Sequence, residues 1–182
     1  MGKVRVTMLV LAGLSLLVLG GFLAYVLPQH RVVHVDGFEV KRVDGRAVAV
    51  TPQQQPAPVS GSDVYFIHAS NPARTDVHVF RNEDTGFGFP WYLKFDAAEL
   101  QGQAQLLARD DNQLVLLTYY GWRIPMLKLF PNVVDVEAWD STTEPWPVFN
   151  IVFLGMFAVL AGVIVWKFRS WRQRWRDRKN AV

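Results

Sequence analysis

The chain has 182 residues, a net charge of +3 and no cysteine, and 51% of it is hydrophobic. A chain of this length holds one modest domain, and the lack of thiols excludes disulfides, thiolate metal sites and cysteine nucleophiles. A basic chain can bind nucleic acid or anionic lipid, and the distribution of its charge distinguishes the two.

Two uncharged apolar stretches lie near the ends of the chain. They cover residues 6–27 and 148–166, which are 22 and 19 residues long. Helices of these lengths reach about 33 Å and about 28 Å, enough to cross the hydrocarbon core of a bilayer. We therefore predict two transmembrane helices. Cleavage of the first as a signal peptide is disfavoured, because the stretch is long and no small-x-small triplet follows it before Pro28.

The charges around these stretches predict the orientation of the chain. Residues 28–147 carry ten basic and 15 acidic side chains, a net charge of −5, whereas the two ends together carry +8. Short basic flanks stay in the cytoplasm. We expect residues 1–5 and 167–182 to be cytoplasmic and residues 28–147 to lie outside, which is the periplasm in a Gram-negative cell. An acidic exported domain also argues against nucleic acid as a partner.

The C-terminal tail alternates aromatic and basic residues beside the second apolar stretch. Such a tail is typical of a stop-transfer anchor whose side chains contact anionic lipid headgroups. A docking site for a cytoplasmic protein is the alternative. The predicted membrane-interface residues are Lys167, Arg169, Trp171, Arg172, Arg174, Trp175 and Arg176.

Residues 28–147 alternate apolar and polar side chains between frequent turn signals, which predicts a small β domain. The Asp-Gly pairs at 36–37 and 44–45 each predict a hairpin, and the Pro/Gln-rich residues 51–62 predict a projecting loop. Strands are expected at residues 63–69, 75–81, 114–124 and 131–139. In the last of these, Val134, Val136 and Ala138 are expected on one face.

One helix is expected within this domain, from its N-cap Asp96 to residue 109, followed later by a short helical turn at 126–130. The order of elements predicts a membrane-anchored α+β protein, in which two transmembrane helices flank a small, mostly antiparallel β domain. That domain is either an OB-like, partly open barrel or an α+β roll.

Four stretches carry a resemblance to a known family: FRNEDTG (80–86), YLKFDAAELQGQAQ (92–105), YYGWRI (119–124) and FPNVVDV (130–136). They resemble a mainly proteobacterial family of membrane proteins that is described as a domain of unknown function. The resemblance covers nearly the whole chain. It implies a bacterial inner-membrane protein and implies no catalytic residues.

The segment GFGFPWYLKF (86–95) concentrates aromatic side chains. Its glycines and proline predict a loop that holds Phe87 and Phe89. A strand is expected at 91–95, with Trp91, Leu93 and Phe95 turned inward and Tyr92 and Lys94 on the other face. The candidate residues for binding a partner or ligand are Phe87, Phe89, Tyr92, Tyr119 and Trp122.

No catalytic, metal or cofactor motif occurs, and we expect no cofactor. Asp76, His78 and the turn at Glu83-Asp84 are compatible with a metal site, although a solvated strand face and a structural turn are favoured. The sequence therefore predicts a non-enzymatic envelope module with a protein partner. The alternatives are a periplasmic module that binds a small molecule, glycan or lipid, and a metal-dependent envelope enzyme.

Overall fold

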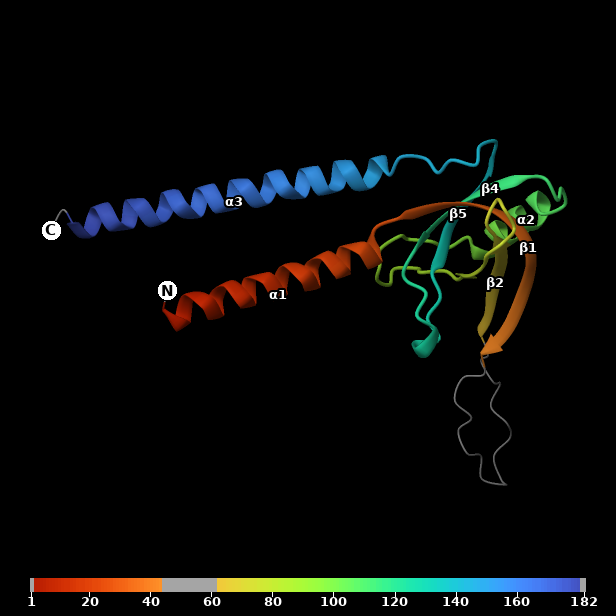
Figure 1. The fold of residues 1–182 in the computed structure, drawn as a ribbon, viewed down its shortest axis with the longest axis horizontal. Helices are drawn as coiled ribbons and strands as arrows, with labels where there is room; N and C mark the ends of the chain where they lie inside the picture. The colour runs from red at the N-terminus through yellow and green to blue at the C-terminus, as the bar shows by residue number, and fades with distance from the viewer. Residues whose placement is uncertain (1, 44–61, 181–182) are drawn as a thin grey trace, which may run out of the picture. The chain divides into compact units, whose positions relative to one another are not determined.

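The computed structural model describes residues 2–43 and 62–180. The chain divides into two compact units, residues 1–145 and 146–182. The elements are α1 (Lys3–Val26), β1 (Gln29–Val43), β2 (Ser62–Ser70), β3 (Val77–Asn82), α2 (Ala97–Leu107), β4 (Leu114–Tyr120), the short 3-10 helix η1 (Pro125–Leu127), β5 (Asn132–Trp139) and α3 (Val148–Asn180) (Figure 1).

The two long helices coincide with the two apolar stretches of the sequence. In α1 the candidate span is Val6–Val26, and in α3 it is Val148–Arg174. Both are long and apolar enough to cross a membrane by length and composition. Helix α3 does not stop at Trp166 but continues to Asn180, so the basic tail is helical.

The five strands form a closed barrel in the order β1-β2-β3-β5-β4, with α2 between β3 and β4 in the sequence. All neighbouring strands are antiparallel except β3 and β5, which are parallel. The prediction of a small OB-like domain is confirmed. The barrel is closed rather than partly open, because β1 pairs with both β2 and β4.

The hairpin predicted at Asp36-Gly37 is wrong. Strand β1 is continuous and curved through this point, with a bulge between Val35 and Gly37 (Figure 1). The bulge bends the strand, so residues 29–33 pair with β4 and residues 34–43 pair with β2. Asp36 accepts a hydrogen bond from Ser70 Oγ at 3.1 Å. The hairpin signal at residues 44–45 and the loop predicted from residue 51 lie outside the described residues.

The core of the barrel is a cluster of buried apolar side chains. Its buried side chains from the strands include Val33, Ile67, Phe80, Leu117, Val133 and Val136, and α2 adds Leu100 and Ala104 to the same cluster. The face predicted for β5 is only partly right. A bulge opposite Thr118 and Tyr119 leaves Val134 without a partner on β4, so Val133 and Val136 point inward instead.

Helix α2 begins close to its predicted start, but Asp96 does not cap it with its side chain. Asp84 takes that role from the neighbouring loop, because its Oδ1 accepts a hydrogen bond from Ala97 N–H at 2.8 Å. The first turn of α2 is therefore tied to the segment that follows β3.

Candidate functional site

The four stretches that carry the family resemblance meet at the C-terminal end of α1. Asn132 Nδ2 donates hydrogen bonds to the Glu83 carbonyl and the Tyr120 hydroxyl, each at 3.0 Å. The Tyr120 ring stacks on Tyr92 with centroids 4.7 Å apart, and the Tyr92 hydroxyl donates to the Val26 carbonyl at 2.6 Å. One residue from each stretch thus lies on a continuous path to α1. We call this region the junction.

The junction satisfies the end of α1 completely. An α-helix leaves its last four carbonyls without partners in the helix. Here each of them has a donor, and three of the four donors belong to residues beyond the helix cap. The pairs are Leu23 O with Leu27 N–H (2.8 Å), Ala24 O with Gln29 Nε2 (3.1 Å), Tyr25 O with Gly121 N–H (2.9 Å) and Val26 O with the Tyr92 hydroxyl (2.6 Å). We call these four bonds the clamp.

Aromatic rings surround the clamp. Tyr25 meets Tyr120 and Trp122 edge-on, with centroids 6.4 Å and 5.6 Å apart. One turn earlier in α1, Phe22 stacks on Phe89 at 5.5 Å. These pairs add packing energy to the hydrogen bonds, and they involve both loops that flank the helix end.

Gly121 is required at the junction by its backbone conformation. Its φ is +92°, a backbone conformation that residues other than glycine rarely adopt. A Cβ atom added there would lie 3.6 Å from both Pro131 and the Tyr25 ring. A Cβ at this position would make ordinary contacts, so it is the left-handed turn after β4 that depends on glycine and presents the Gly121 N–H to the Tyr25 carbonyl.

A buried lysine holds the loop 86–95 against the barrel from the other side. Lys94 is only 4% exposed, and its Nζ donates to Asn82 Oδ1 at 2.5 Å and to the Val133 carbonyl at 2.6 Å. Asn82 is fully buried and donates in turn to the Ala97 carbonyl and to Gln101 Oε1, both at 2.9 Å. Lys94 therefore connects β3, β5 and α2 as a structural cross-link.

Burial changes the ionisation of the junction. It lowers the pKa of Lys94 from 10.5 to about 8, although the nearby carboxylates of Asp96, Asp84 and Glu83 oppose the change. Burial also raises the pKa of the Tyr92 hydroxyl, and the neighbouring Tyr120 raises it further. Tyr92 therefore stays a hydrogen-bond donor to Val26 throughout the physiological pH range.

Comparison with known proteins places the chain in a family. The model of a family described as "Protein of unknown function (DUF1523)" matches residues 4–175. The chain belongs to the DUF1523 family. It is 38% identical over 148 residues to an uncharacterized protein of Haemophilus influenzae, and the match covers 78% of this chain and 83% of that protein. No solved structure matches.

In this DUF1523 protein the loop predicted around Phe87 and Phe89 is present, with the two rings 83% and 51% exposed. The strand predicted at 91–95 is wrong, and the inward face is reversed. Trp91 is 75% exposed, whereas Lys94 is buried and Tyr92 is half-buried. The cause lies in the backbone, because Leu93 adopts a left-handed conformation with φ +52° and breaks the alternation of a strand.

The other two predicted binding residues, Tyr119 and Trp122, line one cavity of about 460 Å³ beside the first residues of β1. Tyr119 is buried against Phe80 in the core, and Trp122 is 41% exposed. Arg31 and Arg123 add positive charge to the same cavity. The structure thus places Tyr119 and Trp122 together, but puts Tyr92 in the clamp.

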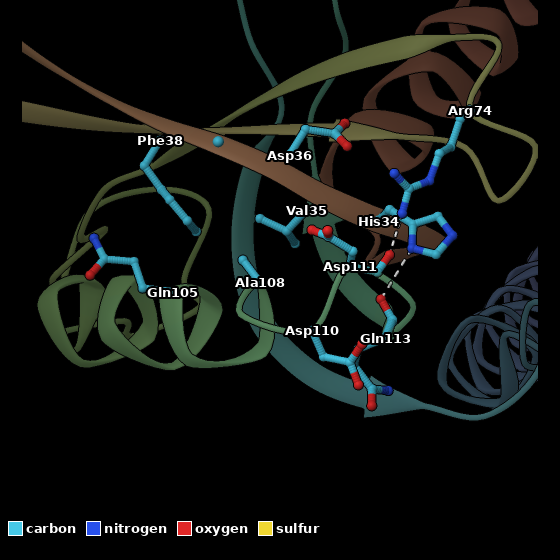
Figure 2. A pocket seen from close by; sticks show the side chains of 11 residues that line it. His34, Val35, Asp36, Phe38, Arg74, Gln105, Ala108, Asp110, Asp111 and Gln113 are labelled. Atoms are coloured by element: carbon cyan, nitrogen blue, oxygen red, sulfur yellow. Dashed lines mark hydrogen bonds between the residues drawn. The ribbon is translucent and has the colours of Figure 1, made fainter.

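Another cavity of this DUF1523 protein, of about 540 Å³, involves none of the predicted site residues. It lies between the bulge of β1 and the turn after α2, with polar side chains around it (Figure 2). His34 Nδ1 contacts the Gln113 carbonyl at 3.2 Å, and Arg74 donates to the Asp111 carbonyl (Figure 2). These bonds tie the cavity walls to each other.

The residues considered for a metal site are engaged in other contacts. Both ring nitrogens of His78 lie within 3.1 Å of the Arg31 guanidinium. Burial lowers the pKa of His78, and the Arg31 charge lowers it further against the opposing effect of Asp76. Asp76 accepts a hydrogen bond from Asn71 in the turn before β3. The described residues contain no group of three or more His, Asp or Glu that could hold a metal ion.

The predicted interface residues of the tail lie on α3. Lys167, Arg169, Trp171, Arg172 and Arg174 are exposed, and Trp171 packs near Phe168 with ring centroids 6.0 Å apart. The side chains of Trp175 and Arg176 lie outside the described residues. The sequence pattern did not reveal Gln29, Asn82, Lys94 or Asn132, whose roles depend on contacts between distant segments.

Proposed function

We propose that this DUF1523 protein is a non-enzymatic, membrane-anchored module that serves as an accessory subunit of an assembly in the bacterial envelope. In this proposal α1 and α3 cross the inner membrane, residues 28–147 lie in the periplasm, and residues 1–5 and 167–182 lie in the cytoplasm. The length and composition of both helices support the anchoring, and the basic ends of the chain support the orientation.

The clamp is the observation that carries the proposal. A protein that needs only a tether can join its domain to a membrane helix through a flexible linker. Here only Leu27 and Pro28 separate α1 from β1, and all four terminal carbonyls of α1 are satisfied at the junction. In this proposal the clamp holds the barrel in a fixed pose on its first helix. A fixed pose is useful to a module that presents one face to a partner in the same membrane.

Purification from native membranes in mild detergent tests this function. We expect the tagged full-length protein to recover a specific membrane or periplasmic protein. The variant with Tyr92→Phe and Gln29→Ala weakens the clamp while leaving the barrel core intact, and it should recover less of that partner. Tyr65→Phe with Gln103→Ala is the matched control. Recovery of the protein alone, or equal recovery with the clamp variant, would contradict the proposal.

The orientation has its own test, because the chain contains no cysteine. Gln103→Cys places a single thiol on α2, and Gln173→Cys places one on the exposed tail of α3. A membrane-impermeant maleimide added to cells with a permeabilised outer membrane should label the first variant, and the second only after lysis. The tail only extends a helix that spans the membrane. Vesicles without anionic lipid should therefore still retain the Gln173→Cys protein.

The cavity of Tyr119 and Trp122 favours a second function, the binding of an anionic small molecule or lipid headgroup. Its two arginines and its tryptophan are suited to an anion with an apolar portion. Native mass spectrometry of the detergent-extracted protein should then show a bound ligand. The Arg31→Gln variant should lose this ligand, and the Arg74→Gln variant should retain it. An absent ligand, or one that Arg31→Gln retains, would exclude this function.

A further inference from the structure

Two loops beside the end of α1 expose large apolar side chains. In the first loop every second residue from 87 to 95 is exposed, from 51% to 83%: Phe87, Phe89, Trp91, Leu93 and Phe95. In the second, Met126 is 94% exposed, Leu127 66% and Trp122 41%. We call these side chains the collar. Exposure on this scale marks an interaction surface rather than scattered apolar residues.

The collar is attached to α1 within its apolar stretch. Phe89 stacks on Phe22, and Trp122 packs edge-on against Tyr25. Trp122 also reaches Gly21, where an added Cβ would lie 3.7 Å from its ring. Both loops thus contact residues of the candidate span Val6–Val26. The Phe89 and Trp122 rings therefore share the environment of the last turns of α1.

The depth of these contacts agrees with the interfacial layer of a bilayer. Phe22 lies four residues before Val26, which corresponds to about 6 Å along the helix axis. Side chains that rest in the interface are buried about 5–10 Å into the boundary between headgroups and acyl chains. Tryptophan and tyrosine are enriched at this level of membrane proteins. The collar has the composition and the position of such a belt.

The charges of the two loops support lipid as the occupant. Residues 28–147 hold 15 of the 16 acidic side chains, yet none lies within residues 85–95 or 112–134. The only lysine of the first loop, Lys94, is buried. The second loop exposes Lys128 and Arg123, and the Arg123 guanidinium lies 4.0 Å from the centre of the Phe130 ring. Cations at this level meet lipid phosphates.

We propose that the collar is inserted into the outer interfacial layer of the membrane, so that the barrel rests on the bilayer with its junction side down. The occupant of this surface is lipid, and a protein partner would have to bind elsewhere on the barrel or on the helices. This inference rests on the proposed anchoring by α1. The clamp and the collar then act together, since the first fixes the barrel on the helix and the second fixes it on the lipid surface.

Single-cysteine variants of the full-length protein test the inference in vesicles of phosphatidylethanolamine and phosphatidylglycerol. Phe87→Cys and Met126→Cys report on the collar, Gln103→Cys on α2 is the exposed control, and Leu16→Cys lies in the middle of α1. Each thiol is labelled with an environment-sensitive fluorophore and exposed to iodide in water or to lipids that carry a quencher near the headgroup. Iodide quenching at the collar should be at least about threefold weaker than at the control, with efficient quenching by the lipids.

Two results would overturn the inference. Iodide quenching at Phe87→Cys and Met126→Cys equal to that at Gln103→Cys would place the collar in water. Protection from both quenchers would show that a second copy of the chain, rather than lipid, covers it. Leu16→Cys separates the two proposals: quenching by a deeply placed lipid quencher confirms the span, whatever the collar does. If Leu16→Cys is instead quenched by iodide, the anchoring itself fails.

Discussion

The stability of the barrel depends on pH through Lys94. The Lys94→Met variant should lose this dependence. Its ammonium group is buried, and burial lowers its pKa from 10.5 to about 8 in the folded protein. Below pH 8 the folded and unfolded chains both carry the proton, so the penalty for the buried charge is constant. Between pH 8 and 10.5 only the unfolded chain carries it. The free energy of unfolding therefore rises by about 1.4 kcal/mol per pH unit in that window.

The size of the effect follows from the two pKa values. Between pH 7 and pH 9.5 the contribution of Lys94 to the free energy of unfolding should increase by about 2 kcal/mol. Above pH 10 a second effect of opposite sign begins. Burial raises the pKa of Tyr92, Tyr119 and Tyr120, so these tyrosines ionise first in the unfolded chain and lower stability as the pH rises. The test is confined to the lower window for this reason.

Urea unfolding of the full-length protein in mild detergent, followed by tryptophan fluorescence, measures the difference. The free energy of unfolding of the wild type minus that of Lys94→Met should grow by about 2 kcal/mol from pH 7 to pH 9.5. Lys41→Met replaces an exposed lysine on β1 and should leave the difference flat. A flat difference for Lys94→Met as well would refute the reasoning, since it would mean that Lys94 titrates as a solvated amine.

Three further substitutions test contacts at or beside the junction. Asp84→Ala should destabilise the barrel by about 1 kcal/mol because it removes the cap of α2, while Asp96→Ala should cost less than half of that in the same urea titration. Tyr92→Phe keeps the stacked ring but loses the bond to α1, and should cost about 1 kcal/mol and speed amide exchange at Gly121. Gly121→Ala should cost about 1 to 3 kcal/mol by placing an alanine in a left-handed conformation, and a cost near zero would contradict that conformation at residue 121.

The sequence predicts those parts of the fold that depend on local patterns. Uncharged runs of about 20 residues can only be long buried or membrane helices, and alternating residues between turn signals mark most strands. The Asp36-Gly37 pair misleads because an Asp-Gly pair is suited both to a hairpin turn and to a β-bulge, and here it lies at a bulge. The deciding fact is that β1 pairs with two different strands, which no local pattern contains.

The contacts of the junction cannot be predicted from local sequence patterns, because they join segments that are far apart in the chain. A lysine among aromatic residues is normally expected to point to solvent, and alternation then places Trp91 and Phe95 in the core. In the structure Leu93 breaks the alternation, and Lys94 turns inward because Asn82 and the Val133 carbonyl supply its acceptors. These partners lie 12 and 39 residues away in the chain. The one available signal was that Asn82, Lys94 and Asn132 lie within the four stretches that carry the resemblance, whereas Gln29 lies outside them.

The central claim is that α1 and the barrel move as one body on the membrane, and a distance distribution tests it most directly. Spin labels on Leu14→Cys in α1 and Gln103→Cys in α2, read by pulsed electron spin resonance in vesicles, report their separation in the full-length protein. We predict one narrow distribution for the wild type, and a broader one when Tyr92→Phe and Gln29→Ala weaken the clamp. A broad distribution in the wild type, unchanged by these substitutions, would show that the chain swivels at Pro28 and would contradict the account.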